Sequence, residues 1–444
     1  MNKNLSSKQI MAVGLMLFAL FFGAGNMIFP PFLGQEAGSN MWTAIIGFLI
    51  TGVGLPLLAI IAIAKAGDVQ TMASRVHPVY GIVFPVVMYL VIGPLFAIPR
   101  TGTVSFEIGV LPFLSENASS SRWPLLIFSI VFFFVTALLA MNPTKLVDTI
   151  GKILTPALLI ILGIIVVKSL ITPLGEPHAP VGPYADGPLF KGFVEGYLTM
   201  DTIAALVFGI IVISSIKGLG VTNKKSLTKI CVQAGIIAAT GLVIVYLSLA
   251  YIGSTAPDTL GTQENGGAIL SGAANYLFGS FGSIILGLAI LFACLTTSIG
   301  LVSACAEYFS KLMPRFSYKT IVIIFSIFST IIANIGLTQL IKFSVPVLVI
   351  IYPLAIVLIV LSFLHNAFKG SSIVYIWALI PTGIISLIDG LNAAGLNMTA
   401  ITDALNFLPL FDQGIGWIVP AILGAIVGYV ISLASGTAEE TITN

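Results

Sequence analysis

The chain has 444 residues, of which 57% are hydrophobic and only 8% are charged, and its mean hydropathy is +1.09. Soluble domains carry about a quarter charged residues, so this composition excludes an ordinary soluble protein and predicts an integral membrane protein embedded in a lipid bilayer. The formal net charge of +2 is uninformative by itself, and we expect no nucleic-acid partner and no obligatory protein partner.

Charge-poor apolar runs predict an all-α polytopic fold with about twelve transmembrane helices, because each helix needs roughly 20 residues to cross the hydrocarbon. The predicted spans are 8–35, 40–64, 79–112, 123–141, 150–171, 190–216, 227–253, 277–310, 319–336, 339–364, 372–390 and 414–434. Basic residues such as Lys3, Lys65, Lys145, Lys224 and Lys311 fall on one side of these spans. The positive-inside rule therefore predicts a multi-pass protein of the cytoplasmic membrane with both termini in the cytoplasm.

The first span is interrupted by helix-breaking residues, namely Gly23, Gly25, Asn26, Pro30 and Pro31. An unpaired backbone group in hydrocarbon costs several kcal/mol, so a break at the bilayer midplane predicts a bound substrate or ion. The free N–H groups of the second half suit a carboxylate, and the last carbonyl groups of the first half suit a cation. The alternative is close helix packing at the glycines.

The third span holds two prolines, the buried arginine Arg100 and, about two helical turns later, Glu107. The same helix face could carry both charges, so they could form a gate on the outer side. Structural pairing without a gating role is the alternative. The neighbouring residues Leu95, Phe96 and Ile98 could line an apolar pocket.

A second break is predicted at 196–202, where the carboxylate of Asp201 lies inside a span. Inserting such a group in the bilayer centre costs about 2.5 kcal/mol or more of free energy, which indicates that the carboxylate has a functional or structural role. Asp201 could bind an ammonium group, bind the coupling ion or carry a proton, or it could anchor the unwound segment to a neighbouring helix.

The two broken spans are the first and sixth, and each opens a set of five spans. Because five is odd, the second set begins on the opposite side of the membrane, which predicts two inverted repeats. The predicted division is 1–172 for the first repeat, 173–189 for a proline-rich extracellular loop, 190–365 for the second repeat and 366–444 for two peripheral helices and the tail. The polar, glycine-rich segment 254–276 is either a connector or a lid over an entrance.

The eighth span places Thr296, Thr297 and Ser298 in the middle of the membrane, close after Ala293. Neutral oxygens of this kind form a plausible sodium cage, although hydroxyl groups in membrane helices also bond their own backbone. We expect no enzyme and no catalytic residue, because the spans hold no histidine, no pair of aspartates and no nucleophile motif. No cofactor is expected apart from Na⁺ or H⁺ as a coupling ion.

At three motifs, residues 23–31, 93–101 and 196–201, the chain resembles the branched-chain amino acid:cation symporters, or BrnQ-type carriers. The resemblance covers nearly the whole chain. It implies a leucine-transporter-like fold with broken helices 1 and 6. It also implies a secondary active transporter that imports leucine, isoleucine and valine with Na⁺ or, in some members, H⁺. Another small neutral amino acid or a nucleobase-like solute is the alternative cargo.

The resemblance also implies positions for the ligands. The substrate carboxylate would bind the amides of Ala24, Gly25 and Asn26, and sodium would bind oxygens of Ala19, Phe22, Ala293, Thr296 and Thr297. We further expect the ammonium group to meet carbonyl groups of Tyr197, Leu198 and Thr199, with Asp201 as a further candidate. The branched side chain would lie among Leu95, Phe96, Ile98, Met200 and Ile299. An acidic residue at position 201 departs from the hydroxyl residues of some members of the wider fold and leaves proton coupling open.

Overall fold

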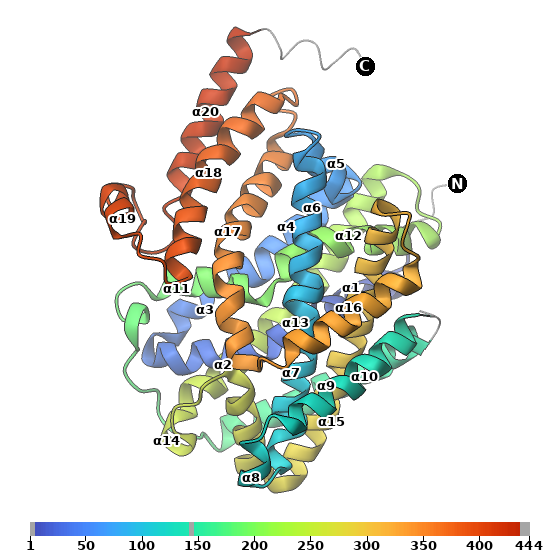
Figure 1. The fold of residues 1–444 in the computed structure, drawn as a ribbon, viewed down its shortest axis with the longest axis vertical. Coiled ribbons are helices and arrows are strands. Elements are labelled where there is room, and N and C mark those ends of the chain that lie inside the picture. The colour runs from blue at the N-terminus through green and yellow to red at the C-terminus, as the bar shows by residue number, and fades with distance from the viewer. Residues whose placement is uncertain (1–4, 142–145, 436–444) are drawn as a thin grey trace.

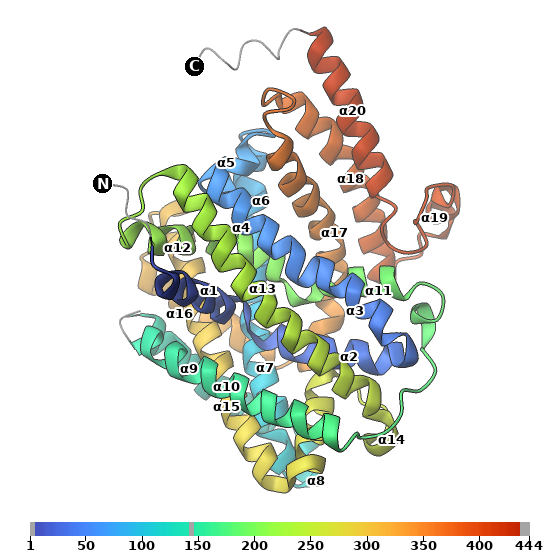
Figure 2. The same cartoon turned by 180° about the vertical axis from the view of Figure 1, so that it is seen from behind.

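The computed structural model describes residues 5–141 and 146–435, and the regular secondary structure of this part is helical (Figures 1 and 2). Within it, eight helices are long and apolar enough to cross a membrane, and four apolar helices of 10–17 residues accompany them. The predicted all-α polytopic fold is confirmed. The ends of the first and last predicted segments, residues 1–4 and 436–444, and the predicted basic position Lys145 lie outside the described residues.

The first five predicted spans correspond to helices that are often split by short 3₁₀ or π turns. In chain order they are α1 (Ser7–Phe21), α2 (Ala24–Ala37), α3 (Met41–Leu49), η2 (Ile50–Gly54), α4 (Leu55–Ala66), α5 (Val69–Ser74), α6 (Tyr80–Leu90), η3 (Val91–Leu95), α7 (Ala97–Gly109), α8 (Glu116–Ser119), α9 (Trp123–Ala140) and α10 (Leu146–Ile171). Two further 3₁₀ turns, η1 (Gly38–Asn40) and η4 (Leu111–Phe113), lie at the ends of α2 and α7.

The remaining spans follow the same order as predicted. They are α11 (Pro188–Glu195), η6 (Gly196–Thr199), α12 (Asp201–Gly218), α13 (Lys224–Thr255), α14 (Pro257–Leu260), α15 (Gly266–Leu312), α16 (Tyr318–Ala333), α17 (Leu337–Leu364), α18 (Ser372–Ala393), α19 (Thr399–Leu405) and α20 (Ile418–Ala434), with the short turn η5 (Gly182–Tyr184) before α11. In Figure 1, α18 and α20 lie together at one side of the molecule, and α18 packs on α17. The division into two inverted repeats stays a prediction.

The half-helix α2 lies inside the protein, where α13, α15, α7 and η6 surround it (Figure 2). All residues 24–31 are buried, whereas α9, α10 and α20 expose large apolar side chains such as Trp123, Ile171 and Val430. Because lipid is as apolar as these side chains, the exposed helices fit contact with a bilayer. The irregular backbone beside α2 is shielded from lipid by protein.

Segment 254–276 is more helical than the expected loop. α13 continues to Thr255, α14 forms one turn, and α15 begins at Gly266 after the Asn265 side chain accepts a hydrogen bond from the Ala268 N–H at 3.0 Å. Such an N-cap satisfies one of the free amides at the start of a helix. The polar residues of this segment therefore suggest a loop in the sequence, although one of them begins a helix. α15 then bends at Gly279, whose φ of 62° lies in the region that glycine adopts most easily.

Candidate functional site

The first break separates α1 from α2 in the interior of the protein. Phe22 leaves the helical conformation at φ −73° and ψ 87°, and Gly23 is extended at φ −121° and ψ −164°. Gly23 at the N-cap of α2 has no side chain to cap the first turn, and the Asn26 amide oxygen accepts only the Gly23 N–H, at 3.0 Å. The following N–H groups of the first turn receive no bond from the cap residue, and their binding to a ligand stays a prediction.

The second break lies between η6 and α12. Met200 joins them with a left-handed φ of 64°, which is uncommon for a residue other than glycine. The Thr199 hydroxyl donates to the Gly196 carbonyl at 3.0 Å and accepts from the Asp201 N–H at 3.3 Å. Strained backbone of this kind is held only when its surroundings fix it, and it clusters at functional sites.

Polar side chains join the two breaks directly. The Asn26 amide donates to the Asp201 carboxylate at 2.6 Å, and the Tyr246 hydroxyl of α13 donates to the same oxygen at 2.8 Å. Asn26 also donates to the Tyr246 hydroxyl and accepts from the Gly23 N–H at 3.0 Å. Asp201 is only 2% exposed, so these neutral donors stabilise a carboxylate that burial penalises.

Arg100 reaches the same region from α7. Its guanidinium donates to the Leu198 carbonyl of η6 at 2.6 Å and to the Ser344 hydroxyl of α17 at 3.2 Å. It also lies over the Phe29 ring, 4.9 Å from the ring centroid. Among the described residues the ion pairs are Lys191–Glu195 and Lys311–Glu307, so Arg100 has no carboxylate partner there.

Glu107 is placed apart from Arg100. One of its carboxylate oxygens accepts from the Asn265 amide at 3.0 Å, and the side chain lines a second pocket of about 310 Å³ at the start of α15. The structure thus shows different partners for the two charges, and a gating role for either stays a prediction.

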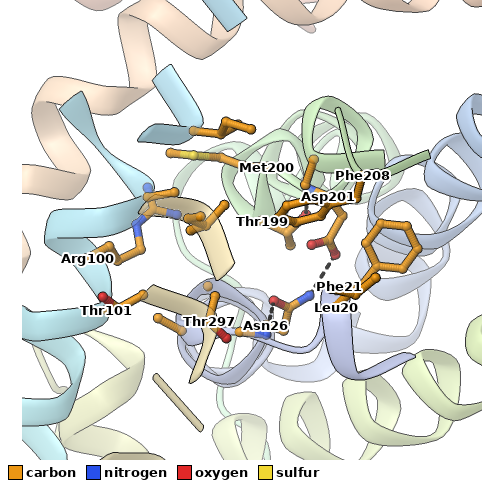
Figure 3. A pocket seen from close by; sticks show the side chains of 17 residues that line it. Leu20, Phe21, Asn26, Arg100, Thr101, Thr199, Met200, Asp201, Phe208 and Thr297 are labelled. Carbon is orange, nitrogen blue, oxygen red and sulfur yellow. Dashed lines mark hydrogen bonds between the residues drawn. The ribbon is translucent and has the colours of Figure 1, made fainter. Parts of the chain in front are cut away.

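A pocket of about 40 Å³ lies between the two breaks (Figure 3). Arg100 and Asp201 line opposite sides of it in the view, with Thr199 between them. This volume holds no more than a few water molecules, so a larger solute requires the surrounding helices to rearrange. The pocket is lined by Leu20, Phe21, Gly23, Ala24, Gly25, Asn26, Ile92, Ala97, Arg100, Thr101, Thr199, Met200, Asp201, Ala204, Phe208, Thr297 and Leu301.

The structure brings part of the predicted binding set to this pocket and leaves part elsewhere. The candidates that line it are Ala24, Gly25, Asn26, Thr199, Met200 and Asp201, together with Arg100 and Thr297 from the predicted gate and ion site. The candidates outside its lining are Leu95, Phe96, Ile98, Tyr197, Leu198 and Ile299. Tyr197 instead stacks on Tyr352 at 4.5 Å between ring centroids, and Leu198 contributes its carbonyl to Arg100.

In the third span, the helix face that lines the pocket differs from the predicted one because of an irregular turn before α7. The π turn η3 and the non-helical Gly93 (φ −89°, ψ −126°) precede α7. A π turn inserts an extra residue and rotates the following helix, so Ala97 and Thr101 face the pocket instead of Leu95 and Ile98. Helical spacing from the predicted residues could have found Ala204 and Phe208, three and seven positions after Asp201, and Leu301, four positions after Thr297.

The predicted sodium ligands come from the end of α1, just before the first break, and from α15. The hydroxyl groups of Thr296 and Thr297 both donate to the Ala293 carbonyl, at 2.8 and 3.0 Å. A Cβ at Gly23 would lie 3.2 Å from the Thr297 methyl carbon, so the break contacts α15 at this point. Ala19 and Phe22 supply the end of α1. Whether these oxygens bind an ion stays a prediction.

Comparison with known proteins supports the fold and the family. A solved structure of Mhp1, a nucleobase-cation-symport-1 family transporter in a closed conformation with bromovinylhydantoin bound, matches with a TM-score of 0.63 at 14% identity, covering 97% of this chain and 93% of that one. The family model described as branched-chain amino acid transport protein matches residues 6–435. The branched-chain amino acid permeases BraB and BrnQ of Bacillus subtilis (strain 168) are 55% and 52% identical, covering 99% and 98% of this chain and 99% of each relative.

The solved structures show a leucine-transporter-like fold, and the family model and the relatives, which are named as permeases, make the protein a polytopic membrane transporter and not an enzyme. Within that class, the chain belongs to the branched-chain amino acid transport protein family.

Proposed function

We propose that this protein imports leucine, isoleucine and valine across the cytoplasmic membrane by symport with Na⁺ or H⁺, alternating access to a site between the two helix breaks, with both termini in the cytoplasm. The observation that carries the proposal is the meeting of α2 and α12 at one pocket, through Asn26 and Asp201. Names of relatives that share half or more of the sequence support the substrate class.

The substrate would bind between two breaks that offer opposite polarity. Free N–H groups at the start of α2 favour a carboxylate, and the carboxylate of Asp201 at the start of α12 favours an ammonium group. A neutral nucleobase-like solute would leave the buried charge of Asp201 without a charged partner, which makes it the weaker candidate. Apolar pocket residues such as Phe208 and Leu301 suit an aliphatic side chain.

The pocket supports the three branched-chain substrates as a group. One methylene group discriminates by only about 1–3 kcal/mol in an apolar site, so leucine, isoleucine and valine should share the carrier. The small volume of the pocket fits a closed state that must open toward one side before a solute enters or leaves.

Two ions are compatible with the proposed coupling. Sodium would bind neutral oxygens of Ala293, Thr296 and Thr297 together with the end of α1. A proton would bind Asp201, whose partners Asn26 and Tyr246 carry no charge.

Uptake of labelled leucine into proteoliposomes tests the function. A sodium gradient and a pH gradient are imposed separately, and unlabelled valine, isoleucine and uracil are added as competitors. We expect one gradient to drive accumulation and only the branched-chain amino acids to compete. Equal uptake with and without both gradients would rule out symport, and competition by uracil alone would rule out the substrate class.

A further inference from the structure

Arg100 is a buried cation that forms no ion pair with a carboxylate among the described residues. Its side chain is 2% exposed, its two hydrogen-bond acceptors are the neutral oxygens of Leu198 and Ser344, and its Nε has no partner. Asp201 lines the opposite side of the same pocket, where its carboxylate accepts hydrogen bonds from Asn26 and Tyr246. A charge removed from water is costly unless it is paired, and Arg100 faces Asp201 only across the pocket, so an anion beside the guanidinium would stabilise it.

The guanidinium of Arg100 also lies beside the start of α2. A Cβ at Gly25 would lie 3.3 Å from Nη1 of Arg100 and 3.3 Å from the Thr199 carbonyl, which is tighter than ordinary contact. Glycine at this position therefore lets the guanidinium lie close to the first turn of α2, and an added side chain would fill the narrow space that remains between them. Two features that attract an anion meet at this space: a buried cation and the N–H groups of the first turn of α2, which Gly23 at the N-cap has no side chain to bond.

We propose that Arg100 binds the carboxylate of the transported amino acid, in the space between its guanidinium and the first turn of α2. The proposal rests on the function proposed above and specifies its substrate as a zwitterion. With the carboxylate at Arg100 and the ammonium group toward Asp201, substrate and site carry two complementary charge pairs. Transport of a compound without the carboxylate would leave Arg100 unpaired, so the site selects against amines and amides.

The position of Arg100 also gives the carboxylate a mechanical role. Arg100 belongs to α7, holds the Leu198 carbonyl of η6 and contacts Phe29 of α2. A carboxylate bound here would bridge the first break to α7 and, through Arg100, to the second break. Substrate binding would thereby favour the arrangement in which both breaks close around the pocket.

A purely structural role is the alternative, in which Arg100 ties η6 to α17 through Ser344. The two roles differ in their response to the chemistry of the ligand. A tether affects all ligands of the pocket alike, whereas a carboxylate-binding residue affects only ligands that carry a carboxylate.

The test compares L-leucine with L-leucinamide, which replaces the carboxylate by a neutral amide and keeps the ammonium group and side chain. The affinity of each compound is measured by calorimetry on the purified full-length protein, for the wild type, Arg100→Gln, and Arg122→Gln as a control arginine in an exposed turn. In the wild type we expect leucine to bind about 100-fold more tightly than leucinamide. In Arg100→Gln this ratio should fall at least about tenfold, and in Arg122→Gln it should not change.

Gly25→Ala provides a second route if Arg100→Gln does not fold, as judged by size-exclusion chromatography. The added methyl group would enter the space between Arg100 and α2. The affinity for leucine should therefore fall at least about tenfold more than the affinity for leucinamide. An unchanged ratio in a folded variant, or equal weakening of both compounds, would overturn the proposal and leave Arg100 as a tether. A wild-type protein that binds neither compound would instead overturn the function on which the proposal rests.

Discussion

The amide of Asn26 donates to the carboxylate of Asp201 across 2.6 Å, although 175 positions separate them in the sequence. This contact fastens the start of α2 to the start of α12, so the two interrupted helices form one polar centre. Tyr246 of α13 completes it by donating to the same carboxylate oxygen. A ligand that engages Asp201 would therefore act on three helices at once.

Replacing Asp201 tests whether its charge holds the ammonium group of the substrate. We expect Asp201→Asn to weaken leucine binding by about 2 kcal/mol, or roughly 30-fold, because it removes a charged acceptor and retains a polar side chain of similar size. Tyr246→Phe removes a neutral hydroxyl that donates to Asp201 and accepts from Asn26, and it should weaken leucine binding by about 1 kcal/mol, or roughly fivefold. Calorimetry on both variants measures the difference. An effect of Tyr246→Phe that equals or exceeds that of Asp201→Asn would argue against the charged role.

The hydroxyl groups on α15 test sodium coupling. In the double variant Thr296→Ala plus Thr297→Ala, the sodium concentration for half-maximal leucine uptake should rise at least about tenfold, since loss of ligands weakens an ion site by that order. Thr297→Ser keeps the hydroxyl and Ser298→Ala removes a neighbouring one that bonds Thr136 at 3.4 Å, so both serve as controls with unchanged sodium dependence. Normal sodium dependence in the double variant would remove the proposed ion site.

Sequence was sufficient to locate the breaks, because helix-breaking residues and a charge have a plain meaning inside an apolar span. Gly23, Asn26 and Asp201 can all be recognised in the sequence for this reason. Tyr246 gives no such signal: it lies in an apolar stretch of α13, and only the packing of α13 on α2 brings it to Asp201.

The direction in which individual side chains point depends on local backbone turns that cannot be recognised from the amino-acid composition. The π turn η3 sets which side of α7 faces the pocket, so Thr101 lines it and Ile98 does not. The apolar surroundings of Arg100 in the sequence mark it as unusual, but its possible partner Glu107 accepts a hydrogen bond from Asn265 instead. The sequence contained both charges and gave no information on the bend that directs each of them.

The left-handed backbone at Met200 predicts an unusual order of stability. This conformation lowers the folding stability by about 1–2 kcal/mol for a residue other than glycine, and by more for a β-branched residue. We therefore expect Met200→Asn and Met200→Gly to keep a higher thermal unfolding midpoint than Met200→Val, although the position is 2% exposed and valine is the most apolar of the three. Fluorescence-monitored unfolding of the purified variants gives the order. If valine proved the most stable, side-chain burial and not backbone strain would dominate at this position.

His365, at the end of α17, should make the stability of the protein depend on pH. Partial burial, with Arg75 nearby as a smaller cause, lowers the pKa of His365 from its ordinary value of 6.5. The unfolded chain then binds a proton more readily than the folded chain does, so stability is lost as the pH falls below about 6.5. We expect the unfolding midpoint of His365→Gln to fall less than that of the wild type between about pH 7.5 and pH 5.5, because glutamine does not titrate. His77→Gln, at an exposed position, is the matched control and should follow the wild type. A parallel decline in wild type and His365→Gln would show that other groups set the acid sensitivity of the fold.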